Sequence, residues 1–287
     1  MDNFYEIVKD GLHFNKFEAD DLICVEYICP LENERSGLIS QADYIVHILS
    51  GKKTWETIHG KWEMEAGDTL YVKKGAAMVR QYFEDEFCIL GFFITDDLIR
   101  ESVSDVKGKT TLQNNNNAHQ FTVTGIQHNP VIDGFFQSML TYFRGQKPPL
   151  DYIIKLKLKE LLINLICSHD NDLLASYFRS VSENSRPSLP HIMESNFCYN
   201  LSLEEFARLT HRSLSTFKRD FFSHYNTTPG KWLLAKRLDY SAKLIRNSDD
   251  NITNIAFDSG FEDVSHFSRV FKGKFGLSPS EFRNVTI

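Results

Sequence analysis

The last hundred residues carry one pattern twice, with the two copies fifty positions apart. In the second copy, apolar residues recur at helical spacing from Ile252 to Phe257, Gly260 interrupts them, and a further helical run follows from Val264 to Phe271. Matched positions hold Phe, Arg, Phe, an aromatic residue and Pro: Phe217, Arg219, Phe221, Tyr225 and Pro229, then Phe267, Arg269, Phe271, Phe275 and Pro279. This shared register predicts two helix-turn-helix units in tandem, and therefore an all-α C-terminal domain.

Capping residues predict where the helices of these units begin. Ser202 with Glu205 three positions later forms a capping box, which satisfies two backbone N–H groups at the start of a helix. Ser213 and Asp263 are expected to cap the second helix of each unit. Ser278, followed by proline, should cap a short final helix.

Three further expectations concern the connections between these helices. His191 to Tyr199 should form a first helix, and Gly230 to Ile245 a connector between the two units. His211 occupies a turn where many such motifs carry glycine, which indicates either a positive backbone φ at this residue or a turn of different geometry. Phe222 stands where the second copy has Lys272, and the sequence leaves open whether it joins the core or packs on the connector.

These motifs resemble the DNA-binding domain of the AraC/XylS family of bacterial transcription regulators. The resemblance covers about the last hundred residues and is carried by Leu201–Ala207, Ser213–Phe221, Ile255–Ala256, Gly260–Phe261, Phe267–Lys272, Phe275–Gly276 and Ser278–Pro279. It implies a sequence-specific regulator, more often an activator, that binds double-stranded promoter DNA and works with RNA polymerase. Recognition helices that enter successive major grooves must lie about 34 Å apart.

The resemblance also implies roles for particular side chains on the two recognition helices. The base-reading candidates are Ser215, Lys218, Arg219, Ser265, Ser268 and Arg269. The two arginines could instead bind phosphate or brace their own domain, and Lys218 could take guanine or phosphate. Phosphate contacts are expected at helix N-termini and nearby lysines, because free N–H groups and positive charge both attract an anion: Ser213, Thr228, Lys231, Lys272, Lys274 and Ser278.

The first hundred residues read as strands separated by turn signals about every eight residues, which predicts an antiparallel β jelly-roll or cupin-like barrel. The expected strands are Leu22–Cys29, Tyr44–Leu49, Lys53–Ile58, Thr69–Val72, Ala77–Phe83 and Phe87–Ile94. The segment from Tyr44 to Ala77 resembles the cupin-like sensor domain often found at the N-terminus of this regulator family. That resemblance implies a signal-sensing role for the barrel.

The barrel region contains residues that could suit two kinds of ligand, a metal ion or an effector. Cupin enzymes hold a metal with histidines and a glutamate, but His47 lacks a second histidine two positions away and His59 falls in a solvated turn. We therefore expect no metal and no cofactor. An effector could be a small molecule or a regulatory protein, and a small molecule could be lined by aromatic residues: Tyr44, Trp55, Trp62, Tyr71 and Tyr82.

Between the barrel and the C-terminal DNA-binding domain, called the reader below, the chain changes to helical periodicity from Pro130. One apolar face runs from Val131 to Phe143, and a wide apolar stripe runs from Ile153 to Ile166. The stripe could pack only on its own barrel, whereas the resemblance favours a homodimer interface for part of it. The expected organisation is a sensor barrel at 1–127, a dimerising helical segment at 128–179, a Ser- and Pro-rich linker at 180–190 and the reader at 191–287.

Bulk properties limit the other functional classes. Net charge is −6, but residues 188–287 hold 13 Lys+Arg against 11 Asp+Glu, so the acidic excess lies in the first part. No apolar run approaches the roughly 18 residues needed to span a bilayer, and the first residues lack a signal-peptide pattern. Five scattered cysteines fit reduced thiols in a cytoplasm. The competing interpretations are a metal-dependent cupin enzyme fused to a DNA reader, or an interaction scaffold without DNA binding.

Overall fold

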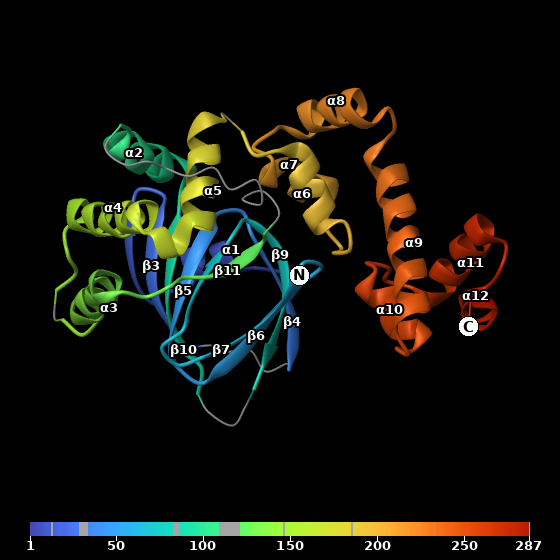
Figure 1. Ribbon diagram of the computed structural model, residues 1–287, viewed down its shortest axis with the longest axis horizontal. Helices are drawn as coiled ribbons and strands as arrows, with labels where there is room; N and C mark the ends of the chain where they lie inside the picture. The colour runs from blue at the N-terminus through green and yellow to red at the C-terminus, as the bar shows by residue number, and fades with distance from the viewer. Residues whose placement is uncertain are drawn as a thin grey trace. The chain divides into compact units, whose positions relative to one another are not determined.

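The computed structural model describes residues 1–12, 14–28, 34–82, 86–108, 121–145, 147–184 and 186–286. The chain divides into two compact units, Met1–Pro187 and Ser188–Ile287 (Figure 1). The first unit contains two β-sheets with helices, and the second is helical throughout. This confirms the expected fold class, a β-rich N-terminal part followed by helices and an all-α C-terminal domain.

The strands of the first unit form two sheets. One has the order β1 (Asp2–Asn3), β4 (Arg35–Ser40), β9 (Gly75–Gln81), β6 (Lys52–Thr57), β7 (Gly60–Glu65). The other has the order β11 (Val123–Gly125), β8 (Thr69–Val72), β5 (Asp43–Ser50), β10 (Cys88–Ile94), β3 (Leu22–Ile28), β2 (Asn15–Ala19). Neighbouring strands are antiparallel except β1 and β4, which are parallel. Each strand expected from the sequence is present, with ends shifted by at most two residues over the described part.

Alternation along the strands divides the apolar side chains of the first unit between two cores. On β10, Ile89 and Phe93 join the cluster between the two sheets, whereas Leu90 and Phe92 join a cluster on the opposite face. We call these the interior core and the outer core. The interior core holds Val46, Trp55 and their neighbours, and it also takes Phe4 from α1 (Phe4–Asp10).

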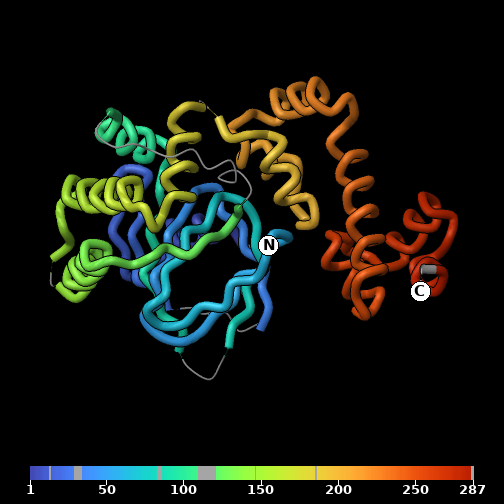
Figure 2. The backbone as a smooth tube through the Cα atoms, viewed as in Figure 1, coloured from blue at the N-terminus to red at the C-terminus, as the bar shows by residue number. Residues whose placement is uncertain are grey.

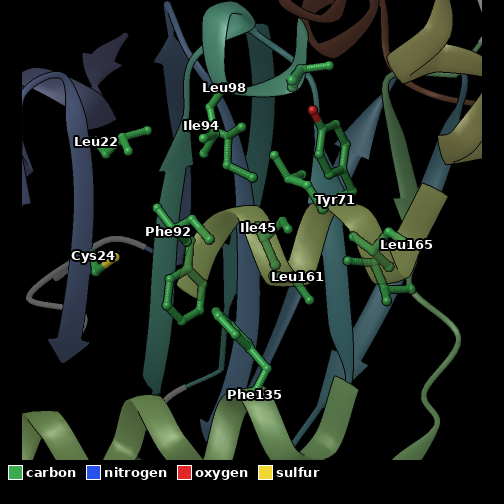
Figure 3. Packing of buried hydrophobic residues seen from close by; sticks show 14 of the residues in the cluster. Leu22, Cys24, Ile45, Tyr71, Phe92, Ile94, Leu98, Phe135, Leu161 and Leu165 are labelled. Carbon is green, nitrogen blue, oxygen red and sulfur yellow. The ribbon is translucent and has the colours of Figure 1, made fainter. Parts of the chain in front are cut away.

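Helices cover the outer face of the six-stranded sheet and complete the outer core. They are α2 (Asp96–Val106), α3 (Pro130–Phe143), α4 (Asp151–Cys167) and α5 (Asp172–Glu183), and a 3₁₀ turn at His169–Asn171 precedes α5. Figure 3 shows Phe135 of α3 and Leu161 and Leu165 of α4 pointing toward the strand residues Ile45, Tyr71 and Phe92. The expected helical stripes therefore bury much of their apolar surface on their own barrel. Because α5 continues to Glu183, the first four residues of the expected linker are helical.

A buried carboxylate ties α5 to the sheet. Asp43, at the start of β5, is fully buried and accepts hydrogen bonds from the hydroxyls of Tyr71 at 2.6 Å and Tyr177 of α5 at 2.7 Å. The backbone N–H of Lys74 donates to its second oxygen at 2.8 Å. Lys73 is also buried, with its Nζ 4.1 Å from the centroid of the Tyr177 ring. A buried carboxylate is tolerated only when it is hydrogen-bonded or paired, and the hydrogen bonds to Asp43 meet that requirement.

The second unit consists of α6 (Leu189–Asn196), α7 (Leu203–Leu209), α8 (Leu214–Tyr225), α9 (Pro229–Asn247), α10 (Ile252–Asp258), α11 (Val264–Phe275) and α12 (Pro279–Thr286). Helices α7 and α8 form the first helix-turn-helix unit, and α10 and α11 form the second. Figure 2 shows the chain path of α9, which runs from the end of the first helix-turn-helix (α7–α8) to the start of the second (α10–α11). Among the residues that the structure describes, none of the helices combines the length and apolar character needed to cross a membrane.

Candidate nucleic-acid interface

The expected capping residues begin the helices of both helix-turn-helix units. Ser202 Oγ accepts from the backbone N–H of Glu205 at 3.2 Å, and the Glu205 carboxylate accepts from the N–H of Ser202 at 2.6 Å. Ser213 caps α8 by accepting from the N–H of Thr216 at 3.3 Å, and Asp263 caps α11. These bonds fix where each recognition helix starts, and hence which side chains share its exposed face.

Helix α8 buries one face and exposes the other. Phe217 and Phe221 are completely buried in the unit, as their spacing predicts. Ser215, Lys218 and Arg219 lie on the exposed side, and 76% of the Arg219 side chain is accessible. Arg219 Nη2 lies 3.4 Å from a carboxylate oxygen of its neighbour Asp220, an exposed contact that constrains the guanidinium only weakly.

Helix α11 repeats this arrangement fifty residues later. Phe267 and Phe271 are completely buried, Ser265 and Arg269 are exposed, and Ser268 is half-buried. No Asp or Glu occurs between Val264 and Phe275, so the exposed face is purely cationic and polar. Both recognition helices thus present the sequence-predicted base-reading candidates to solvent.

The candidate phosphate contacts fall into two groups. Lys231 and Lys272 are exposed, as a phosphate ligand requires. Lys274 instead donates to Asp239 Oδ1 at 2.7 Å and to the Ala235 carbonyl at 3.1 Å, so it braces α11 against α9.

The three candidate helix N-termini also differ from one another. The hydroxyls of Ser213 and Ser278 are both occupied at the starts of their helices. Ser213 Oγ accepts from the N–H of Thr216, and Ser278 Oγ donates to the Glu281 carboxylate at 2.7 Å. Thr228 forms no side-chain cap bond at the start of α9.

The turns of the two units adopt left-handed backbone conformations. His211 has φ 52°, which is the first of the two alternatives for that position, and Gly260 has φ 87°. Glycine is required at position 260 for a second reason, because a Cβ there would lie 2.6 Å from the carbonyl oxygen of Cys198. The turn of the second unit therefore packs directly on the backbone that follows α6.

Arg237 joins the two halves of this unit. Its Nε donates to the Phe197 carbonyl and its Nη2 to the Tyr199 carbonyl, both at 2.7 Å. The sequence suggested only that Arg237 would lie outside or form structural pairs. Burial lowers the pKa of its guanidinium, but the two charge-assisted hydrogen bonds hold the group in place beside Gly260. The segment after α6 is thereby fixed to the turn of the second helix-turn-helix unit.

Helix α9 contacts both halves through its two ends. Trp232 near its start packs against the rings of Phe221 and Tyr225, with centroids 5.9 and 5.1 Å away. Leu238, Ala242 and Ile245 in its second half enter the core formed with α10, α11 and α12. Nineteen residues of helix span about 28 Å. The two recognition helices are thus held at opposite ends of one rigid connector.

Comparisons with known proteins identify both units. Residues 206–284 match the family model for the helix-turn-helix domain, and residues 43–177 match that for the ExsA N-terminal regulatory domain. The chain belongs to the AraC/XylS family. It is a DNA-binding transcription regulator with an N-terminal regulatory domain.

Relatives of this AraC/XylS regulator extend over most of its length. It is 25% identical over 278 residues to the virulence regulon transcriptional activator VirF of Yersinia enterocolitica, covering 93% of this chain and 97% of VirF. It is 25% identical over 245 residues to the HTH-type transcriptional regulator ExsA of Pseudomonas aeruginosa, covering 85% and 87%. The transcriptional activator RhaS of Escherichia fergusonii is 37% identical over 122 residues, 42% of each chain.

The structure of this regulator separates the five aromatic effector-pocket candidates. Tyr44 and Trp55 lie in the interior core, and Trp62, the strand partner of Trp55, packs against it. Tyr71 points to the opposite face of the sheet and lies in the outer core. Tyr82 pairs with the hydroxyl of Thr54 at 3.1 Å. Three of the five candidates thus share one core, and the alternation of β8 explains why Tyr71 does not join them.

The interior core around these aromatics is filled in part by the N-terminal helix. Phe4 of α1 packs with ring centroids 5.3 Å from Tyr44, 5.6 Å from Tyr27 and 5.1 Å from Phe93. Sequence reasoning did not anticipate α1, although Asn3 caps it and Phe4, Tyr5 and Val8 have helical spacing.

The two barrel histidines that the sequence raised as metal ligands lie in different surroundings. His47 Nδ1 pairs with Thr69 Oγ1 at 2.8 Å, and the His47 ring stacks on Phe136 at 4.1 Å. Burial, with repulsion from His128, lowers the pKa of His47 to about 4. His59 is exposed, as its turn position predicts. Over the described ranges, no group of three or more His, Cys, Asp or Glu side chains converges to hold a metal ion.

Proposed function

We propose that this regulator binds promoter DNA by inserting α8 and α11 into two successive major-groove segments on one face of the duplex. The observation that carries the proposal is the pair of matching exposed helix faces at opposite ends of α9. The length of α9, about 28 Å, is close to the roughly 34 Å of one helical turn of DNA. Because Arg237 and Gly260 fix the two halves to each other, one protein chain would read a segment of two blocks in constant register.

Within this proposal, the exposed side chains divide into base-reading and positioning groups. Base reading falls to two sets, Ser215, Lys218 and Arg219 on α8, and Ser265, Ser268 and Arg269 on α11. Phosphate contacts fall first to Lys231 and Lys272, which are exposed, and to the N–H groups at the starts of α8, α9 and α12. Lys274 is the weakest phosphate candidate, because Asp239 already neutralises it.

We further propose that the protein acts as an activator in the cytoplasm, through contact with RNA polymerase. The relatives VirF and RhaS are named as transcriptional activators and support this direction of control. The barrel would respond to an effector, either a small molecule bound among the interior-core aromatics Tyr44, Trp55 and Trp62 or a regulatory protein bound outside. A signal acts only if it binds two arrangements of the protein with different affinity.

The helices next to the barrel are proposed to form a homodimer. Helix α4 buries Leu158, Leu161 and Leu162 on the sheet, but its opposite side exposes two apolar residues one turn apart, Tyr152 at 70% and Leu156 at 43%. Replacing both with glutamine should convert a dimer into a monomer in analytical ultracentrifugation, while the circular dichroism spectrum stays unchanged. A native chain that sediments as a monomer at high micromolar concentration would contradict the dimer.

Selection of bound DNA from a random duplex pool tests the DNA-reading proposal. The full chain should recover one motif with two information-rich blocks about one helical turn apart. Arg269→Ala should relax preference at one base pair in one block, at a cost of about 1–3 kcal/mol, if the side chain reads a base. Lys272→Ala should weaken binding to all sequences equally and reduce the salt dependence by about one charge.

A matched control comes from Lys243, which is exposed on α9 and belongs to neither recognition helix. Lys243→Ala should leave the motif and the affinity unchanged. Recovery of no motif by the full chain or by residues 188–287 would refute sequence-specific reading.

A further inference from the structure

One residue of α8 breaks the chemical match between the two recognition helices. Phe222 is 53% exposed, whereas the position fifty residues later is the exposed Lys272. Its neighbour Phe221 is completely buried, so α8 places one phenyl ring in the core and the next on the surface. The sequence left open whether Phe222 would join the core or pack on the connector. With about half of its surface exposed, Phe222 is not a core residue and is not fully covered by the connector.

Phe222 lies at the centre of the face that carries the proposed base-reading residues. With about 100° of rotation per residue, Lys218, Phe222, Ser215 and Arg219 follow one another around the helix within an arc of about 100°. The buried Phe217 lies on the opposite side. A single exposed aromatic residue is ordinary on a protein surface. Phe222, however, lies between Lys218 and Arg219 on the face of α8 that would enter the major groove, so its ring would meet the base edges there.

The position along the helix separates Phe222 from the other candidates. Seven residues from Ser215 to Phe222 correspond to about 10 Å, or about three base-pair steps of 3.4 Å. Phe222 lies roughly one helical turn beyond Lys218 and about 4.5 Å beyond Arg219. It would therefore reach a base pair that neither of these two side chains reads.

The chemistry of the phenyl group selects its target. A phenyl ring offers no hydrogen-bond donor to a base edge and no charge to a phosphate. The base edges of the major groove carry one apolar group, the C5-methyl of thymine. We propose that Phe222 recognises a thymine C5-methyl in the first of the two major-groove segments. The matching residue of the second recognition helix, Lys272, would instead contact a phosphate. This inference rests on the proposed insertion of α8 into DNA.

The expected size of the effect follows from the burial of one methyl group. Removing a methyl that is fully buried against the ring should weaken binding about fourfold. The effect should be confined to one thymine, because one ring can cover one methyl at a time.

The test compares thymine with deoxyuridine, which lacks the methyl and keeps the same base pairing. The full chain is titrated, by fluorescence anisotropy, with its selected duplex and with duplexes in which one thymine at a time is replaced by deoxyuridine. The native chain should lose about fourfold in affinity at one position of the first segment. Phe222→Ala should bind the thymine and deoxyuridine duplexes equally well, and Phe222→Lys should also lose the methyl dependence while binding more tightly at low salt.

Phe257 supplies the matched control. It is 51% exposed in the same unit but lies on α10, outside both recognition helices. Phe257→Ala should keep the full dependence on the thymine methyl.

The possible outcomes separate this inference from the proposed function. A native chain that binds a two-block motif without methyl dependence at any thymine overturns the inference and leaves DNA reading intact. Methyl dependence that persists in both Phe222 variants also overturns it. A native chain that selects no DNA at all overturns the proposed function itself. If Phe222→Ala binds every duplex like the native chain but fails to activate transcription, the ring contacts a protein instead, and the inference is wrong.

Discussion

Replacing Gly260 with alanine tests how the second helix-turn-helix unit is held against the backbone that follows α6. Gly260 has φ 87°, and a Cβ there would lie 2.6 Å from the carbonyl oxygen of Cys198 and 2.9 Å from Nε of Arg237. Comfortable contacts between non-bonded carbon atoms need about 3.5 Å. Alanine therefore fits only if the Cys198 backbone or the turn moves.

Two costs combine in this substitution. A left-handed backbone conformation costs a residue with a Cβ about 1–2 kcal/mol relative to glycine. Overpacking against fixed neighbours typically costs a further 1–3 kcal/mol. We expect the free energy of unfolding of residues 188–287 to fall by about 2–5 kcal/mol, a large part of the roughly 5–15 kcal/mol that stabilises a domain.

Gly276 provides the control that separates the two costs. It has φ 79°, yet no described atom lies within 4 Å of the position of its Cβ, so alanine there meets only the conformational cost. Urea unfolding of residues 188–287, followed by far-ultraviolet circular dichroism, gives both values against the native sequence. Equal losses for the two variants would show that the close approach to Cys198 contributes nothing, and would refute the reasoning.

Three further predictions follow from single contacts. Arg237→Lys cannot serve both the Phe197 and Tyr199 carbonyls, so urea unfolding of residues 188–287 should show a loss of about 1–3 kcal/mol; an unchanged midpoint would contradict this. His211→Gly removes the strain of a left-handed residue with φ 52°, so the free energy of unfolding measured in the same way should rise by at most about 1 kcal/mol. A fall would show that the contacts of His211 outweigh the strain. Burial lowers the pKa of Lys73 to about 7, against its ordinary 10.5, so above pH 7 the unfolded chain binds the extra proton and the free energy of unfolding should rise between pH 7 and 10. Lys73→Met should flatten this rise in thermal unfolding of the full chain, and an unchanged slope would argue against the neutral folded lysine.

Local sequence signals located the reader and most of the barrel strands. Caps such as Ser213 and Asp263 and the buried pair Phe217 and Phe221 depend on residues within one or two helical turns. Such features can be read directly from the chain. Helix α2 was not predicted, although it also carries a local signal: Thr95 caps it by accepting a hydrogen bond from the N–H of Leu98.

Contacts between distant segments could not be predicted in this way. The bond from Tyr177 to Asp43 joins residues 134 positions apart, and nothing near either residue announces the other. For Arg237 the sequence left two alternatives open, a position outside the core or a structural pair, and it named no partner. Arg237 is half-buried because carbonyl groups after the end of α6 need donors, and only the tertiary fold brings them within reach.

The effector candidates illustrate an intermediate case. Strand alternation alone implies that Tyr71 cannot face the same side as Leu70 and Val72, and the structure places it in the other core. Alternation does not say which face of a strand is the interior of a barrel, however. That assignment depends on which helices cover the sheet, and Tyr71 is covered by the ring of Phe178 from α5.

The rigidity of the reader limits how a signal can control it. Within Ser188–Ile287, the backbone between α6 and α7 is held by Arg237, packs on Gly260 and is linked by a hydrogen bond from Asn200 to Glu262. Changing the spacing of α8 and α11 would break these contacts together, at a cost of several kcal/mol. Typical allosteric couplings amount to about 1–3 kcal/mol. If the barrel responds to an effector as proposed, a coupling of this size would not reset the spacing, and the effector would act by changing how often the intact DNA-binding domain is available to DNA or how many copies bind together.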